Sequence, residues 1–171
     1  EYFHAHAKLM HMFFRIGTAR NQDEYKQVNA LIRLPGLKNE NKAITPWSKF
    51  WFHYSHKIHA WIIRDYDKLL FHCNKVIAIF NEHPELKKAH YIHFLQALEH
   101  KSRTLVHMQF EKESAEVLNL LKIEIQKNRK WINIETYKQW FNSKCETELW
   151  YHLVFAKFNE GVECIHKMEL E

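Results

Sequence analysis

The chain has 171 residues, 46% of them hydrophobic and 15% aromatic, which excludes a disordered protein and suffices for one compact domain. Three glycines and three prolines leave little turn chemistry for hairpins, so the composition favours long helices and an all-α fold. The formal net charge is +5, but acidic residues lie among the lysines and arginines throughout, so we expect no nucleic-acid partner.

The three cysteines indicate the compartment. Cys73, Cys145 and Cys164 are odd in number and lack CxxC spacing, which disfavours a disulfide framework and a thiolate zinc site. We interpret them as structural thiols and predict a cytoplasmic protein. No stretch approaches the roughly 18 uninterrupted apolar residues of a membrane span. The first residue is not Met, so the sequence leaves open an upstream signal or a longer parent chain.

Apolar residues at helical spacing predict eight helices. Pro35 follows the second of them, Thr45 and Pro46 provide an N-cap and a first-turn proline for the third, and Pro84 follows the fourth. The polar segment 37–46 is interpreted as a linker. The predicted helices span about residues 2–19, 22–34, 47–63, 66–82, 88–107, 110–126, 134–156 and 159–169.

An aromatic residue marks the turn within each successive pair of predicted helices. The markers are Tyr25, Tyr66, Phe110 and Phe158, spaced by 41, 44 and 48 residues. Seven residues after the markers all four positions are apolar, namely Ile32, Cys73, Val117 and Ile165. One amphipathic pair cannot cover both of its faces, so successive pairs must stack.

These markers predict a single domain over residues 1–171 made of four antiparallel helix pairs, with repeats at about 1–36, 45–84, 87–127 and 133–171. Each marker aromatic is expected to fill the corner between its two helices. The alternative architecture is one closed helical bundle, in which the same apolar stripes would meet around a common axis.

The second pair, HKIHAWIIRDYDKLLFHCNKVIAIFNEHPEL, resembles a tetratricopeptide repeat (TPR). Asp65-Tyr66 occupy the place of that family's turn, and Leu69, Cys73 and Val76 occupy its packing positions. The resemblance implies a right-handed superhelical α-solenoid that acts as a non-catalytic scaffold and binds a protein or peptide. The partner, the oligomeric state and any effector domain on a longer chain are not specified by the sequence.

The same resemblance implies a binding surface, because the first helix of each TPR pair lines the concave side of the superhelix. Rigid aromatic side chains there would anchor a peptide. The alternative is that Trp51 and Trp61 belong to the core between pairs. The positions placed on the concave face are Trp51, Tyr54, Ile58, Trp61, Leu98, Arg103 and Trp150.

Fourteen histidines raise a metal hypothesis, since His53, His56 and His59 are three residues apart, as are His90 and His93. A metal site needs ligands that converge from different helices, so we predict no metal and no cofactor. A helical-bundle metalloprotein using clustered histidines is the alternative function. No G-x-S-x-G serine and no glycine-rich phosphate loop is present, and we predict no enzyme activity.

Overall fold

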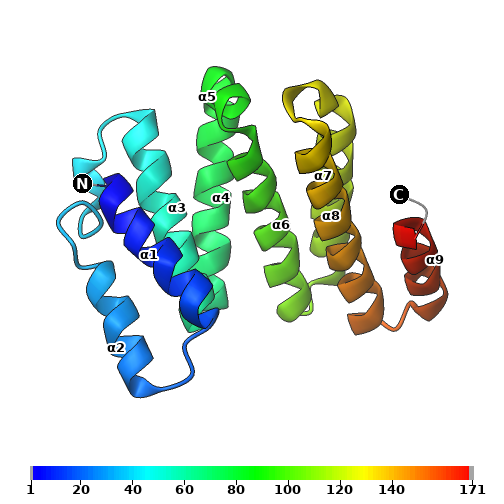
Figure 1. Cartoon of the computed structure of the whole chain (residues 1–171), viewed down its shortest axis with the longest axis horizontal. Coiled ribbons are helices and arrows are strands. Elements are labelled where there is room, and N and C mark those ends of the chain that lie inside the picture. The colour runs from blue at the N-terminus through cyan, green and yellow to red at the C-terminus, as the bar shows by residue number, and fades with distance from the viewer. Residues whose placement is uncertain (1, 170–171) are drawn as a thin grey trace. The chain divides into compact units, whose positions relative to one another are not determined.

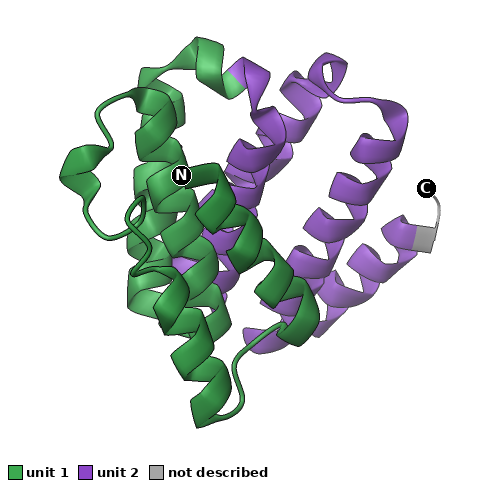
Figure 2. Cartoon of the chain, turned by 60° about the vertical axis from the view of Figure 1, so that its left-hand side comes forward, with its two compact units in different colours: residues 1–87 green, residues 88–171 purple. Residues whose placement is uncertain are grey.

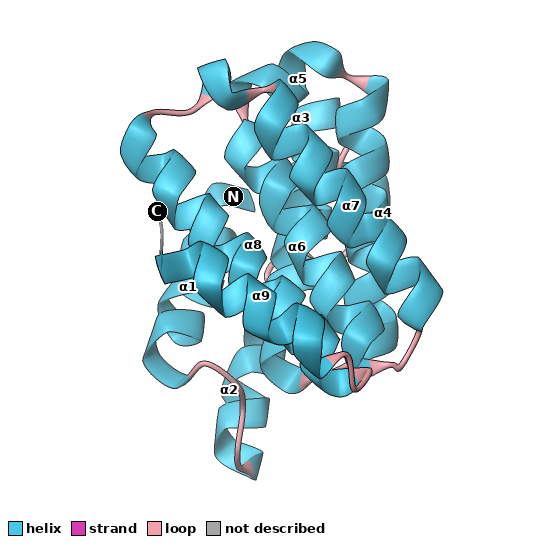
Figure 3. Cartoon of the chain, turned by 90° about the vertical axis from the view of Figure 1, so that its right-hand side faces the viewer, coloured by secondary structure: helices cyan, strands magenta, loops and turns pink. Residues whose placement is uncertain are grey.

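A computed structural model describes residues 2–169 of the chain, and Figure 1 shows its path. Every regular element in that range is a helix and none is a strand (Figure 3). The predicted all-α class is therefore confirmed. The α-helices are α1 (Tyr2–Ile16), α2 (Gln22–Leu31), α3 (Pro46–Ile63), α4 (Tyr66–Glu82), α5 (Pro84–Ala89), α6 (Tyr91–His107), α7 (Glu111–Lys127), α8 (Ile134–Val154) and α9 (Phe158–Glu169). Two short 3-10 helices, η1 (Glu40–Lys42) and η2 (Arg129–Trp131), precede α3 and α8.

The chain divides into two compact units, coloured separately in Figure 2. Unit 1 comprises residues 1–87 and contains α1 to α4, and unit 2 comprises residues 88–171 and contains α6 to α9. The division falls within α5. No helix among the described residues is both long enough and apolar enough to cross a bilayer.

Helix α3 forms the centre of unit 1 and contacts α1, α2 and α4. Its start is set by a capping box, in which Thr45 accepts a hydrogen bond from the Ser48 backbone at 3.1 Å and Ser48 accepts one from the Thr45 backbone at 3.0 Å. Pro46 occupies the first turn, as predicted. The fully buried rings of Phe50 and Phe80 pack in a tilted arrangement with their centroids 5.1 Å apart, which joins α3 to α4.

Unit 2 is built on contacts among α6, α7, α8 and α9. The Tyr91 hydroxyl at the start of α6 donates a 2.6 Å hydrogen bond to the Glu124 carbonyl near the end of α7. Ser143 of α8 donates a 2.6 Å hydrogen bond to the buried carboxylate of Glu99 on α6. Buried polar groups are thus paired across helices as well as within them.

Three helix-to-helix turns share one backbone geometry. Arg64, Gln109 and Ala156 have left-handed φ values of 58°, 61° and 55°. In each turn the next backbone N–H donates to the carbonyl five residues earlier, at 3.0, 2.9 and 2.8 Å respectively, and a new helix begins at the following residue. This is the hydrogen-bond pattern of a Schellman motif, and it sets the relative direction of the two helices.

The aromatic markers do not repeat in step with these turns. Tyr66 and Phe158 begin their helices, but Phe110 is the N-cap of α7 and Tyr25 lies inside α2. Phe110 and Phe158 are 44% and 63% exposed, so the expectation that each marker fills a corner is wrong for these two. The feature that recurs is the left-handed backbone turn with its hydrogen bond to the carbonyl five residues earlier. The side chain that follows this turn varies in its exposure.

Several helix ends also differ from prediction. Helix α1 ends at Ile16 because Gly17 takes a left-handed φ of 65° and its N–H closes back on the Phe13 carbonyl at 2.7 Å. Residues 84–107 form two helices, α5 and α6, interrupted at His90, where one was predicted from residue 88. The predicted linker 37–46 contains the short helix η1.

Replacing Gln109 by Gly should stabilise unit 2. A left-handed conformation costs an L-residue roughly 1–2 kcal/mol, and Gly avoids most of that cost. We expect Gln109→Gly to raise the free energy of unfolding by about 0.5–1 kcal/mol, measured by urea denaturation of the whole chain. The matched control is Glu116→Gly on the exposed side of α7, which should lower it by about 1 kcal/mol. A loss of stability at both positions would contradict the left-handed assignment.

Candidate functional site

The seven positions predicted to bind a ligand differ in their exposure. Trp61 and Arg103 are half-buried, and Trp150 is 43% exposed on α8. That all seven positions share one concave face stays a prediction. The other four side chains are buried, namely Trp51, Tyr54, Ile58 and Leu98.

Trp51 lies inside an aromatic cluster of unit 1. Its ring is 5.8 Å from that of Phe3, 5.0 Å from that of Phe50 and 4.7 Å from the imidazole of His6. Tyr54 is part of the same cluster, and the Lys57 ammonium lies 4.0 Å above its ring. These contacts make Trp51 and Tyr54 core side chains that join α1 to α3, with little surface left for a ligand.

Arg103 joins α6 to α8 in unit 2. Its guanidinium lies 2.9 Å from the Glu99 carboxylate and donates a 2.9 Å hydrogen bond to the Thr147 hydroxyl. A further contact of 3.5 Å reaches Glu146. Since these partners occupy the fork of the guanidinium, the structure gives Arg103 a packing role.

Helix α9 has an apolar side that the described residues leave open. Phe158, Val162 and Ile165 are spaced i, i+4, i+7 and lie on one side of the helix, with exposures of 63%, 52% and 42%. We refer to these three residues as the α9 stripe. The neighbouring side, which carries Gly161 and buried Cys164, packs against α8. One side of α9 is therefore covered by α8, and the side that carries the α9 stripe is exposed.

The shared turn allows α9 to be compared with α7 position by position. Counting from the first residue of each helix, Val162 corresponds to Ala115, and Ile165 corresponds to Leu118. In α7, Leu118 is only 9% exposed and forms a buried cluster with Val106 and Tyr151, against which Ala115 and Phe155 pack. Two of the three residues of the α9 stripe, Val162 and Ile165, are thus equivalent to positions that are packed on α7, whereas Phe158 corresponds to the exposed Glu111.

Buried histidines of α3 and α4 form a hydrogen-bonded cluster in unit 1. Nδ1 of His53 lies 3.2 Å from Nδ1 of His72, and Nε2 of His53 lies 3.2 Å from the Glu40 carboxylate. If His53 donates its Nε2 proton to Glu40, its Nδ1 accepts, and His72 must be the donor. His56 bonds the Leu37 carbonyl at 2.8 Å. Spacing along α3 indicated His53 and His56 but gave no signal for His72 on the next helix.

Burial keeps these imidazoles neutral. Desolvation lowers the pKa of His72 from 6.5 to about 3, with smaller contributions from His56 and His53. Desolvation likewise lowers the pKa of His59 to about 4, and its Nε2 lies 2.9 Å from the Asn29 side-chain oxygen. The pKa of His53 and that of His56 are lowered by the same cause.

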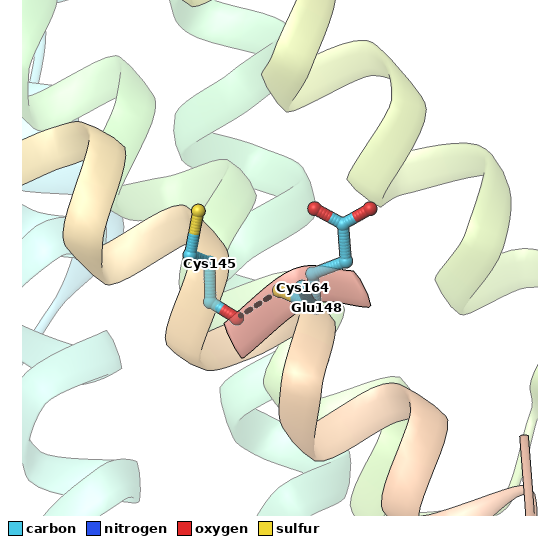
Figure 4. Close-up of side chains that lie close together, drawn as sticks. All are labelled: Cys145, Glu148 and Cys164. Carbon is cyan, nitrogen blue, oxygen red and sulfur yellow. Dashed lines mark hydrogen bonds between the residues drawn. The ribbon is translucent and has the colours of Figure 1, made fainter. Parts of the chain in front are cut away.

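Two thiols and a carboxylate meet between α8 and α9. The Sγ atoms of Cys145 and Cys164 and a carboxylate oxygen of Glu148 all lie within 4.8 Å of one another. Figure 4 shows Cys145 and Glu148 on successive turns of α8 and Cys164 on α9, with its thiol donating to the Cys145 carbonyl at 3.3 Å. This is the one group of three potential metal ligands found among residues 2–169. No spacing along the chain indicated this group, because only the turn at Ala156 brings Cys164 beside Cys145.

A cavity of about 330 Å³ adjoins the carboxylate of this group. Lys144 and Glu148 both line it, together with the rings of Tyr137 and Phe141 from α8. The Lys144 ammonium lies 3.1 Å from Glu148, and that of Lys122 on α7 lies 3.9 Å away. Although partial burial raises the pKa of Glu148, the neighbouring Lys144 outweighs it, and the net pKa is lowered.

Comparison with protein-family models, with curated proteins and with solved structures gives no match to this chain.

The histidine cluster predicts loss of stability in acid. In the unfolded chain these imidazoles protonate near pH 6.5, whereas folded His59 and His72 resist protonation down to about pH 4 and about pH 3. The unfolded state then binds more protons, so stability is full above pH 6.5 and falls as the pH drops. Between pH 6.5 and its pKa in the folded chain, each of these two histidines should lower the free energy of unfolding by about 1.4 kcal/mol for every pH unit.

Thermal unfolding followed by circular dichroism between pH 7.5 and pH 4.5 measures this dependence. The variant His72→Gln should show a smaller fall in melting temperature over that range. A parallel series on His11→Gln, an exposed histidine of α1, tests whether the effect belongs to the buried cluster. An unchanged slope in His72→Gln would show that its imidazole does not resist protonation in the folded chain.

Proposed function

We propose that this chain is a non-catalytic scaffold of TPR-like helix pairs that binds a protein partner. Three turns of one geometry, at Arg64, Gln109 and Ala156, support a repeated helix pair as its building unit. A right-handed superhelix of antiparallel pairs is the arrangement that such repeats adopt, and stacking of pairs leaves an apolar surface at each uncovered end.

The observation that carries the proposal is the open α9 stripe. Monomeric proteins expose single apolar side chains commonly, but an aligned row on one helix indicates an interaction surface. On α7 the equivalent positions, Ala115 and Leu118, belong to a packed cluster that contains the buried ring of Tyr151. Phe158, Val162 and Ile165 have no such cover among the described residues.

This comparison also specifies the partner's chemistry. A helix that fits the α9 stripe should resemble the side of α8 that packs on α7, with one or two aromatic rings at helical spacing. Recognition of an amphipathic helix by such anchors at i, i+3, i+4 and i+7 is a common mode of peptide binding. The ligand expected is therefore an amphipathic helix of a protein, rather than an extended or charged segment.

The predicted concave face is kept as a second surface of the same scaffold. Among its seven residues Trp150 offers the largest exposed area, and its ring lies 5.9 Å from the imidazole of His107. The alternative function, a metalloprotein using clustered histidines, has less support. His53 and His72 bring two nitrogens together, and no histidine belongs to the three-ligand group found in the described chain.

The test is loss of partner binding on substitution of the α9 stripe. Proteins captured by the purified chain are identified, and the helical segment that binds is titrated as a synthetic peptide. The double variant Val162→Lys, Ile165→Lys should bind that peptide at least about tenfold more weakly, because two apolar anchors are replaced by charges.

The matched control is the pair Asn159→Lys and Glu163→Gln, which adds the same charge to exposed polar positions of α9. Its affinity should equal that of the unchanged chain, and circular dichroism should show equal helix content in all three proteins. Equal peptide affinity in the stripe variant and the control would contradict the assignment of this surface.

A further inference from the structure

The strongest unexplained group of side chains in the molecule is the cluster of Cys145, Glu148 and Cys164. The two thiols are almost fully buried, at 0% and 2% exposure, and they come from different helices. Their ligand atoms already lie within 4.8 Å of one another and of the Glu148 carboxylate. In a tetrahedral zinc site, bond lengths of about 2.0–2.3 Å place ligand atoms about 3.3–3.8 Å apart. Side-chain movements of about 1 Å would close the gap.

We propose that Cys145, Glu148 and Cys164 bind a thiophilic divalent cation, with Zn²⁺ as the expected ion. Thiolate and carboxylate are both ligands that Zn²⁺ accepts, and three protein ligands leave a fourth position for a further donor. The ion would join α9 to α8 directly below the α9 stripe. The site is distinct from the histidine cluster, which lies in unit 1.

The formal charges of the cluster and Lys144 sum to zero both without and with a bound Zn²⁺. Without an ion, the two thiols are neutral, and the Glu148 carboxylate is paired with the Lys144 ammonium at 3.1 Å. With Zn²⁺, two thiolates and a carboxylate contribute three negative charges, which the ion and Lys144 together neutralise. Lys144 is therefore placed as a supporting cation that need not leave when the ion binds.

Two further features lie beside Glu148, a histidine of α8 and a cavity. His152 lies one turn after Glu148 on α8, and its Nδ1 is buried without a hydrogen-bond partner among the described residues. Its nitrogens are not among the ligand atoms that all lie within 4.8 Å of one another, so the fourth position is left for a donor from solution. The cavity of about 330 Å³ that Lys144 and Glu148 line brings solvent to the carboxylate of the proposed site.

Binding must release the two thiol protons to solvent, which makes the affinity depend on pH. The apparent affinity for the ion should therefore increase as the pH rises from 6 to 8, because the ion competes with protons for the sulfur atoms.

The test titrates the reduced, metal-free chain with Co²⁺ as a spectroscopic probe and then with Zn²⁺. We expect one Co²⁺ per chain, a sulfur-to-cobalt charge-transfer band, and displacement of that band by Zn²⁺. Competition with a chromophoric chelator then gives the Zn²⁺ affinity. Absence of the thiolate band, or a Co²⁺ spectrum from imidazole ligands alone, would overturn the proposal.

Three variants identify the ligands. Cys164→Ser should abolish the charge-transfer contribution of one sulfur and weaken Zn²⁺ binding about 100-fold or more, since even supporting residues change affinity about 10- to 100-fold. Glu148→Gln should keep the thiolate band and weaken binding about tenfold. The control Cys73→Ser, which removes a buried thiol from unit 1, should change neither.

Circular dichroism establishes that each variant is folded. If Cys164→Ser unfolds, the variant Glu148→Gln tests the ligand set instead. The Glu148 side chain is partly exposed and Gln has the same shape, so this variant should stay folded. Unchanged Zn²⁺ affinity in Glu148→Gln would then contradict the proposed ligand set.

Discussion

A backbone hydrogen bond that spans five residues fixes the corner between helices at three places in this chain. At Arg64, Gln109 and Ala156 the left-handed residue reverses the chain, and the next N–H reaches a carbonyl of the helix just ended. Because the following helix starts one residue later each time, every position in α4, α7 and α9 has a defined counterpart. The geometry is costly for residues other than glycine, and burial of the paired helices offsets that cost.

The common register explains why α9 has an open side. In α7, the side that carries Leu118 is buried by Tyr151 and Phe155. In α9, the corresponding Ile165 is exposed, although the neighbouring Cys164 is buried against α8. One turn geometry thus produces both features on which function is argued, the α9 stripe and the meeting of two cysteines with Glu148. A metal ion at the second would hold in place the helix that carries the first.

Much of the fold could be predicted from the sequence because helix starts depend on local chemistry. Thr45 and Asp65 cap their helices through side-chain oxygens. Leu69, Cys73 and Val76, the packing positions that the resemblance to a TPR implied, are buried. The left-handed turns were not predictable, since Gln109 and Ala156 are neither glycine nor asparagine. The contacts of His72 with His53 and of Cys164 with Cys145 could not be predicted either. They depend on the relative register of two helices, which the left-handed turn sets and the side-chain pattern does not reveal.

Leu118 on α7 and Ile165 on α9 occupy equivalent positions but differ in solvent exposure, and thiol labelling measures that difference. Single variants Leu118→Cys and Ile165→Cys are reacted with a maleimide in the native chain, where Cys73, Cys145 and Cys164 are buried. The account predicts that Ile165→Cys reacts at least about tenfold faster, since Leu118→Cys must wait for local opening. Equal rates would contradict it, because they would show that the α9 stripe is as well covered in the folded chain as its counterpart on α7.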